Sequence, residues 1–288
     1  MKKILVTGAN GQLGKCLKDA SEVYPQFQFT FASREQLDIS DKNAVSSLFA
    51  SENISHCINA AAYTNVDKAE SEKEQAFAIN AEAVKQLAQV CSENNTILYH
   101  ISTDYVFDGT NNTPYIEEDE VNPINVYGAS KLEGELNIQD ALSNYFIIRT
   151  SWLYSQYGHN FMNSMIRFAR EGRPLTITTE QTGVPTNAND LAKAILKLIA
   201  NDVTDYGVYH FSNKGEATWY DFAKAILENT GLENATTLAK TDYYATFAKR
   251  PVYSILDTNK IKKFAPESLV DWKQSLQYLI EKNLTANH

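Results

Sequence analysis

The stretch that decides the fold is Thr7-Gly8-Ala9-Asn10-Gly11-Gln12-Leu13-Gly14, close to the start of the chain. It follows a short apolar run, 4–7, and opens an amphipathic stretch, 12–20, so it predicts a strand, a tight turn and a helix. Glycines spaced G-x-x-G-x-x-G let the backbone approach a pyrophosphate, and the helix N-terminus supplies N–H donors and a favourable dipole. The stretch therefore predicts a dinucleotide-binding loop.

Beyond this loop, apolar runs alternate with amphipathic stretches through the first half of the chain. The runs are apolar along most of their length, which is typical of strands buried on both faces of a sheet. Repeated strand–helix units predict an α/β fold with a Rossmann-type, doubly wound parallel sheet. The predicted strands are 4–7, 28–32, 56–60, 96–102 and 146–149, and the predicted helices are 12–20, 41–50 (capped by Asp41), 72–92 and 126–142.

The pattern loosens after about residue 150, and no Pro/Ser/Gly-rich linker separates the halves. We expect a Rossmann domain over 1–150, joined by returning segments around 186–225. The remainder of 151–288 is then mainly a smaller α/β substrate-binding region. Its predicted elements are helices at 160–171, 190–201, 218–229 and 271–282, a short alternating strand at 208–211, and an irregular aromatic segment at 236–254.

Composition excludes several classes of protein. The 288 residues are 43% hydrophobic and 21% charged, which argues against disorder, and the net charge of −9 argues against a nucleic-acid or membrane-surface binder. No apolar run is long enough to span a membrane. Cys16, Cys57 and Cys91 form no CxxC or Cys/His cluster, so we expect neither disulfides nor zinc, and a cytoplasmic location.

The end of the second predicted strand bears on the choice of cofactor. An acidic residue there would hold the ribose of NAD, but the chain has Ala32-Ser33-Arg34. Ser33 and Arg34 suit the 2′-phosphate of NADP, although Arg34 could also be a solvated loop residue. We expect NADPH, with NADH as the alternative. Asp38 could accept from the adenine amino group, with Ile39 beside it.

Tyr127-Gly128-Ala129-Ser130-Lys131 is the second chemical signal. Residues four apart lie on one face of a helix, and a lysine cation lowers the pKa of a nearby tyrosine. The pair therefore suits proton donation to a carbonyl that receives hydride. A hydroxyl that orients the same carbonyl is expected from Thr103, or alternatively Ser102, at the carboxyl end of a predicted strand.

The glycine loop, Ser102-Thr103-Asp104 and Tyr127-x-x-x-Lys131 together resemble the extended short-chain dehydrogenase/reductase superfamily. Within it, the chain is most similar to the family of dTDP-4-dehydrorhamnose reductases. Further blocks of this resemblance span nearly the whole chain: Asn59-Ala60-Ala61-Ala62-Tyr63-Thr64-Asn65-Val66-Asp67-Lys68-Ala69-Glu70, Tyr105-Val106-Phe107-Asp108-Gly109, Pro123-Ile124-Asn125-Val126-Tyr127-Gly128, Arg149-Thr150-Ser151-Trp152-Leu153-Tyr154, Gly183-Val184-Pro185-Thr186 and Lys249-Arg250-Pro251.

The resemblance implies reduction of dTDP-4-dehydro-6-deoxy-L-mannose at C4 to dTDP-L-rhamnose, the last step of dTDP-rhamnose synthesis. The implied catalytic residues are Thr103 (carbonyl orientation), Tyr127 (proton donor) and Lys131 (which lowers the pKa of Tyr127). The implied cofactor site comprises Gly8, Asn10, Gly11, Gln12, Leu13, Gly14, Arg34, Asp38, Ile39, Ala60, Ala61, Ala62, Tyr63, Ser102, Tyr127 and Lys131. The implied substrate site comprises Val66, Thr103, Asp104, Tyr105, Tyr127, Trp152 and Arg250.

Lys15 stands where some members carry a glutamate linked to a magnesium-bridged dimer, so we expect no metal. The oligomeric state stays open, with a homodimer as one option. Three other functions compete: a nucleotide-sugar epimerase or dehydratase, a reductase forming the talose epimer, and a non-catalytic dinucleotide-binding regulatory subunit. Tyr105 follows Asp104 where a dehydratase would carry a second carboxylate, which weakens the dehydratase hypothesis.

Overall fold

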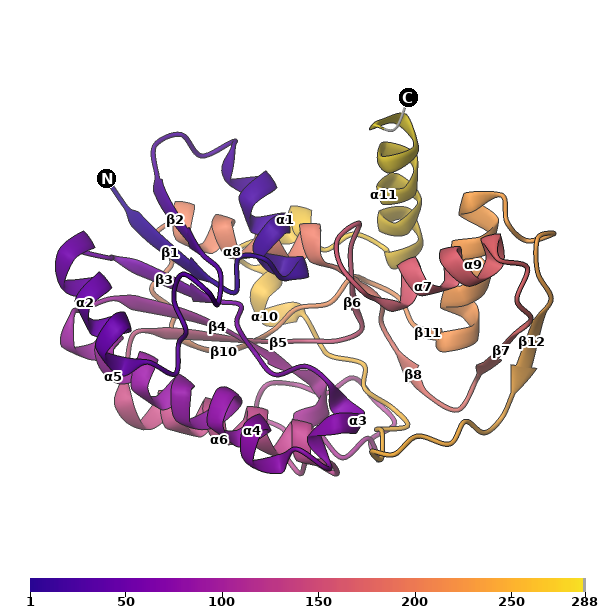
Figure 1. Ribbon diagram of the computed structural model, residues 1–288, viewed down its shortest axis with the longest axis horizontal. Helices are drawn as coiled ribbons and strands as arrows, with labels where there is room; N and C mark the ends of the chain where they lie inside the picture. The colour runs from indigo at the N-terminus through magenta and orange to yellow at the C-terminus, as the bar shows by residue number, and fades with distance from the viewer. Residues whose placement is uncertain (287–288) are drawn as a thin grey trace.

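A six-stranded parallel sheet forms the centre of the structure, a computed structural model that describes residues 1–286 (Figure 1). The strand order is β10-β5-β4-β3-β1-β2, and every neighbouring pair is parallel. The strands are β1 (Lys3–Thr7), β2 (Gln28–Ala32), β3 (His56–Asn59), β4 (Ile97–Thr103), β5 (Tyr145–Thr150) and β10 (Gly207–His210). The predicted boundaries of all six are right to within one residue.

Helices cover both faces of this sheet, which confirms the predicted doubly wound α/β class (Figure 1). One face is covered by α1 (Gln12–Ser21) and α8 (Ala188–Ala200). The other is covered by α2 (Lys42–Glu52), α5 (Ala83–Glu93) and α6 (Val126–Ala141). Asp41 caps α2 as predicted, because its side chain accepts a hydrogen bond from the Ala44 amide.

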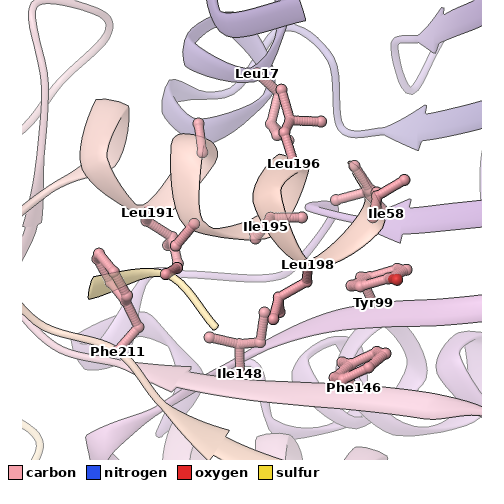
Figure 2. Packing of buried hydrophobic residues seen from close by; sticks show 14 of the residues in the cluster. Leu17, Ile58, Tyr99, Phe146, Ile148, Leu191, Ile195, Leu196, Leu198 and Phe211 are labelled. Carbon is pink, nitrogen blue, oxygen red and sulfur yellow. The ribbon is translucent and has the colours of Figure 1, made fainter. Parts of the chain in front are cut away.

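Helix α8 explains why the chain returns to the sheet after residue 186. Leu191, Ile195 and Leu198 are fully buried, and they pack with Ile148 of β5 and Leu17 of α1 (Figure 2). A helix that is apolar on most of its surface is stable only between two packed layers. Here those layers are α1 and the sheet, so α8 and β10 complete the core that the first half begins.

The helix predicted over 72–92 is present, but a π-helical turn interrupts its regular geometry. It comprises α4 (Lys73–Phe77), the π turn (Ala78–Glu82) and α5, and the short α3 (Val66–Ala69) precedes it. A π turn inserts one residue into the helix and redirects its side chains, often at functional sites. This one turns Asn80 toward the Tyr63 backbone and the Ser130 hydroxyl of α6.

A second core holds the C-terminal region together. It lies among α7 (Phe161–Arg170), α9 (Trp219–Thr230) and α11 (Trp272–Ala286). The short α10 (Asn259–Lys262) belongs to the first core and lies beside β10. Three two-stranded ladders accompany these helices: β6 (Leu153–Tyr154) with β9 (Thr186–Asn187), β8 (Thr182–Gly183) with β11 (Ala217–Thr218), and β7 (Leu175–Thr178) with β12 (Leu238–Thr241). Strand β12 lies in the segment predicted to be irregular.

Within residues 1–286, none of the helices combines the length and apolar character that crossing a bilayer requires.

Candidate active site

The glycine loop lies at the point where the order in which the chain adds strands to the sheet reverses. From β1 the chain runs outward to β2 and then crosses to β3 on the other side of β1. The loops after β1 and β3 therefore face each other, and such switch points are where α/β sheets bind ligands. A Cβ on Gly8, whose φ is +66°, would lie 2.7 Å from the Ala60 carbonyl carbon, and one on Gly14 would lie 2.4 Å from the Gly8 oxygen. Only glycine fits these two positions.

The start of helix α1 suits an anionic group. Gly11 is the N-cap and has no side chain that could cap the helix, and the first turn contains no acidic residue. The helix thus keeps unpaired N–H donors and the positive end of its dipole. Gln12 accepts hydrogen bonds from Ser155 at 3.1 Å and from Asn160 at 2.9 Å, which joins the loop to the C-terminal region. The residues present therefore fit a dinucleotide pyrophosphate.

Four of the predicted cofactor residues lie outside the cleft that holds most of the others. Arg34 is exposed and pairs with Asp38 at 3.2 Å, while Ser40 donates to Asp38 and holds the pKa of that carboxyl below its ordinary value. Ile39 is buried. Tyr63 donates its hydroxyl proton to Glu72 at 2.6 Å, so its side chain points to the α4 side. Arg34, Asp38, Ile39 and Tyr63 do not line the cleft described below.

Helix α6 is held in place at its N-cap, two residues before Tyr127. The Asn125 side chain caps the helix by accepting from the Gly128 amide at 2.7 Å, and it donates to the Lys249 carbonyl at 2.8 Å. Gly128 allows the helix to approach the loop after β4, because a Cβ at this position would lie only 2.2 Å from the backbone carbonyl oxygen of Tyr105. This close approach brings Tyr127 next to Thr103.

Tyr127 and Thr103 share the predicted site at the end of β4. The Thr103 hydroxyl donates to Asp104 at 3.0 Å, and the Tyr105 and Tyr127 rings meet edge to face at 5.9 Å. Burial raises the pKa of Tyr127 above its ordinary value, and hydrogen bonding by Thr103 opposes that rise. Tyr127 is therefore protonated at neutral pH, as a proton donor must be. The lowering of this pKa by Lys131 stays a prediction.

Lys131 follows one turn later on α6, and its side chain is almost fully buried. Its ammonium nitrogen donates to the Ile101 carbonyl at 2.7 Å and lies 3.1 Å from Nε2 of His100. Burial lowers the pKa of Lys131 to about 8, against an opposing effect of Glu135. Ser102, the alternative to Thr103, donates its hydroxyl proton to Glu135. Because Thr103 and not Ser102 hydrogen-bonds Tyr127, Thr103 is the better placed of the two.

One cleft of about 610 Å³ gathers most of the predicted residues. Those that line it are Asn10, Gly11, Gln12, Leu13, Ala60, Ala61, Ala62, Val66, Ser102, Thr103, Asp104, Tyr105, Tyr127, Lys131, Trp152 and Arg250. A second cavity of about 620 Å³ adjoins it, because His159, Asn160, Trp219 and Arg250 line both. The two spaces together offer room for a cofactor and for a second elongated ligand.

Arg250 stands where the two cavities meet. Its guanidinium bonds Asp67 at 2.9 Å and the Tyr105 hydroxyl at 3.4 Å, and its buried Nε has no hydrogen-bond partner. Among residues 1–286, the buried Asp104 Oδ2 and Thr150 Oγ1 also lack partners, and both residues line the cleft. Buried polar atoms are nearly always paired in native proteins. Unpaired atoms that converge on one cleft indicate a polar ligand.

Trp152 lines the cleft with its aromatic ring, which is stacked on a second tryptophan, Trp219. Its ring stacks on Trp219 with the centroids 3.7 Å apart, and Trp219 donates to Gln181 at 2.9 Å. The Trp152 backbone has a φ of +43°, a left-handed conformation that is costly for a tryptophan. Packing against Trp219 and Gly183 holds this conformation.

Sequence reasoning missed several residues of this site. Trp219, Asp67 and His100 carry no local motif of their own, and each reaches the site only through pairing of distant segments. Asp67 and Asn59 do lie in the block 59–70 quoted above, which was the one available signal. No signal in the sequence placed Asn80 near the site, because its contacts with Tyr63 and Ser130 depend on the π turn.

Comparisons with known proteins agree with this geometry. The family model described as the RmlD substrate binding domain matches residues 1–285. The dTDP-4-dehydrorhamnose reductase of Aggregatibacter actinomycetemcomitans is 38% identical, covering 96% of this chain and 98% of its own length. The spore coat polysaccharide biosynthesis protein SpsK of Bacillus subtilis is 36% identical, with 99% of each chain covered.

Solved structures place the chain in the same group. The dTDP-4-dehydrorhamnose reductase of Clostridium acetobutylicum superposes with a TM-score of 0.91 at 38% identity, covering 98% of this chain and 99% of that one. The reductase of Bacillus anthracis, solved in complex with NADP, has a TM-score of 0.91 at 36% identity, with coverage of 98% and 99%. These matches run over nearly the full length of both partners, and we conclude that the chain belongs to the RmlD substrate binding domain family.

Proposed function

We propose that the chain is an NADPH-dependent reductase that converts the C4 keto group of dTDP-4-dehydro-6-deoxy-L-mannose to the hydroxyl of dTDP-L-rhamnose. The observation that carries this proposal is the meeting of Thr103, Tyr127 and Lys131 in one cleft with the glycine loop. The names of the curated relatives and the NADP complex of the Bacillus anthracis enzyme support it. Stoichiometric oxidation of NADPH when this substrate is added tests it.

The proposed chemistry divides among three side chains. Thr103 and Tyr127 hydrogen-bond the C4 oxygen and orient it, and Tyr127 gives its proton to that oxygen as the carbon is reduced. When bound in the cleft, NADPH supplies the hydride. Lys131 would lower the pKa of Tyr127 and hydrogen-bond the nicotinamide ribose. Burial raises the pKa of Tyr127, so its phenol keeps its proton until substrate arrives. Tyr127 therefore enters each turnover protonated, as a proton donor must be.

The substrate diphosphate and sugar would lie along the joined cavities. We assign the deoxysugar to Val66, Asp104, Tyr105 and the Trp152–Trp219 pair, since an aromatic face suits a sugar ring. We assign the diphosphate to Arg250, whose Nε is free for an anion. The nucleotide base then occupies the second cavity, between Phe168, Leu175 and Ile177 on its apolar side.

Arg250→Ala should raise KM for the sugar nucleotide by about 10- to 100-fold, because a hydrogen bond to a charged group contributes about 1.5–3 kcal/mol. The KM for NADPH should change little. Steady-state kinetics with each ligand varied in turn measures both constants. Equal effects on the two constants would remove Arg250 from the diphosphate site.

Arg34→Ala should change the KM for the cofactor and leave the KM for the sugar nucleotide unchanged. We expect the KM for NADPH to rise by about tenfold, with that for NADH unchanged, because the lost contact is to the 2′-phosphate alone. The sugar-nucleotide KM should stay as in the wild type, so the two arginine variants control for each other. If NADPH and NADH respond equally, Arg34 is a solvated loop residue.

Three further features complete the proposal. Residues 1–150, with the returning α8 and β10, bind the cofactor, and the rest of 151–288 mainly binds the substrate. The three buried free cysteines support a reducing, cytoplasmic location. We propose no metal, nucleic-acid or membrane partner, and a homodimer stays as one option.

The competing functions have distinct outcomes. An epimerase retains its NAD and oxidises no external cofactor, so nicotinamide that copurifies with the protein would favour it. A regulatory subunit would bind the dinucleotide without turning over a deoxysugar. A talose-forming reductase would consume NADPH but give the C4 epimer, which NMR of the isolated product distinguishes.

A further inference from the structure

The segment that follows β12 exposes three aromatic side chains within five residues. Tyr243 is 71% exposed, Tyr244 is 57% exposed and Phe247 is 74% exposed. Among the other Phe, Tyr and Trp residues that the structure describes, only Tyr278 of α11 is exposed in this way. Exposed apolar side chains that gather in one place mark binding sites more often than single ones do. We call residues 243–247 the aromatic strap.

The aromatic strap is held at its two ends. Before it, the Thr179 amide donates to the Thr241 carbonyl at 2.9 Å, and after it the Ala248 amide donates to Asp67 of α3 at 3.1 Å. The strap thus runs from β12 back to α3 (Figure 1). Within the described chain, the hydrogen bonds of the strap itself all stay inside 241–248. A segment with so few outside contacts can move while its ends stay fixed.

Part of the aromatic strap forms a wall of the second cavity. Tyr244 and Thr246 line this cavity of about 620 Å³, whereas Tyr243 and Phe247 are not part of its lining. Arg250, which follows the strap, lines the same cavity. A nucleoside diphosphate whose phosphates bind Arg250 can therefore place its base in the space that Tyr244 borders.

Asp67 connects the aromatic strap to the assigned diphosphate site. One of its carboxylate oxygens accepts from the Ala248 amide at 3.1 Å, and the other accepts from the Arg250 guanidinium at 2.9 Å. Asp67 itself lines the second cavity. An anion that binds Arg250 therefore acts on a carboxylate that also fixes the end of the strap.

We propose that the aromatic strap closes over the nucleoside of the sugar nucleotide and that Tyr244 stacks on its thymine base. The inference rests on the proposed function in taking a dTDP sugar as the substrate. A tyrosine ring that is 57% exposed gains from contact with a flat base, because stacking removes apolar surface from water. In the closed state the base lies between Tyr244 and the apolar lining of the second cavity.

Calorimetric titration of the full-length protein with dTDP tests the stacking contact. Saturating NADPH is present throughout, which keeps dTDP out of the cofactor site. Tyr244→Ala should weaken dTDP binding by about tenfold, a common effect of removing an aromatic ring that stacks on a base. Tyr244→Phe keeps the ring, so its affinity for dTDP should stay within about twofold of the wild type.

Tyr243→Ala and Phe247→Ala are the matched controls. Each removes an exposed ring of the same strap that is not part of the cavity lining, so the affinity for dTDP should equal that of the wild type. All three side chains are exposed, and we expect the variants to unfold at the wild-type urea midpoint. An unchanged affinity in Tyr244→Ala, or an equal loss in Tyr243→Ala, would overturn the proposal.

Hydrogen exchange measures the closure separately. The amides of 243–247 should exchange rapidly in the free protein and at least about tenfold more slowly with saturating dTDP. Unchanged exchange on dTDP binding would show that the strap does not close. The proposed function fails by a different result, which is a wild-type protein that binds no dTDP. Normal dTDP binding by both the wild type and Tyr244→Ala would contradict the strap proposal alone.

Discussion

Tyr127→Phe should lower kcat for reduction of dTDP-4-dehydro-6-deoxy-L-mannose by about 10²- to 10⁴-fold, the usual contribution of general acid catalysis. In the proposed mechanism the phenol is the proton donor: it hydrogen-bonds Thr103, and burial raises its pKa, so it keeps its proton at neutral pH. Phenylalanine keeps the ring contact with Tyr105. NADPH affinity, measured by fluorescence titration, should stay within a few-fold of the wild type.

Tyr99→Phe is the matched control for this variant. Tyr99 lies on β4, its ring is buried against Phe146, and it does not line the cleft. Removing its hydroxyl should leave kcat near the wild-type value. If Tyr127→Phe retained more than about a tenth of kcat, another group would have to supply the proton.

Arg149→Met should destabilise the protein by about 3–5 kcal/mol, because it leaves Glu135 as an unpaired buried charge. Arg149 donates to Glu135 from Nε at 3.0 Å and from Nη2 at 2.7 Å, and both side chains are almost fully buried. Glu135 also accepts from Ser102, so the cluster ties α6 to β4 and β5. Urea unfolding at pH 7 measures the change in midpoint and slope.

The double variant Glu135→Leu/Arg149→Met separates the charge from the fold. Replacing a buried ion pair by apolar side chains is often close to neutral, so we expect the double variant to be more stable than Arg149→Met alone. A loss below about 1 kcal/mol in Arg149→Met would show that Glu135 finds another partner or a proton. Because the cluster adjoins Thr103, a modest fall in kcat is expected even in the stable double variant.

The sheet could be predicted because each of its strands is a local signal. Strands buried on both faces read as apolar runs, and the glycine loop fixed where the first one ends. Strands β7 and β12 could not be found in this way. Each is four residues long, and it is a strand only because the other pairs with it across a long separation in sequence.

Part of the candidate site could also be predicted from local signals, and the rest depends on contacts between distant segments. Tyr127 and Lys131 are four residues apart on one helix, and Thr103 ends a strand, so local spacing was enough to nominate them. Other contacts of the site join elements that are distant in the sequence: Asn125 donates to the Lys249 carbonyl, Arg250 donates to Asp67, and Trp152 stacks on Trp219. His100 is an ordinary strand residue until β3 and α6 are placed on either side of it.

Reduction of a C4 ketone by NADPH can be followed in a single assay. Purified protein is mixed with NADPH and dTDP-4-dehydro-6-deoxy-L-mannose, the loss of nicotinamide absorbance is followed, and the sugar product is identified by NMR. We expect one NADPH to be oxidised per substrate consumed, with dTDP-L-rhamnose as the product. Binding of both ligands without oxidation of NADPH would contradict it.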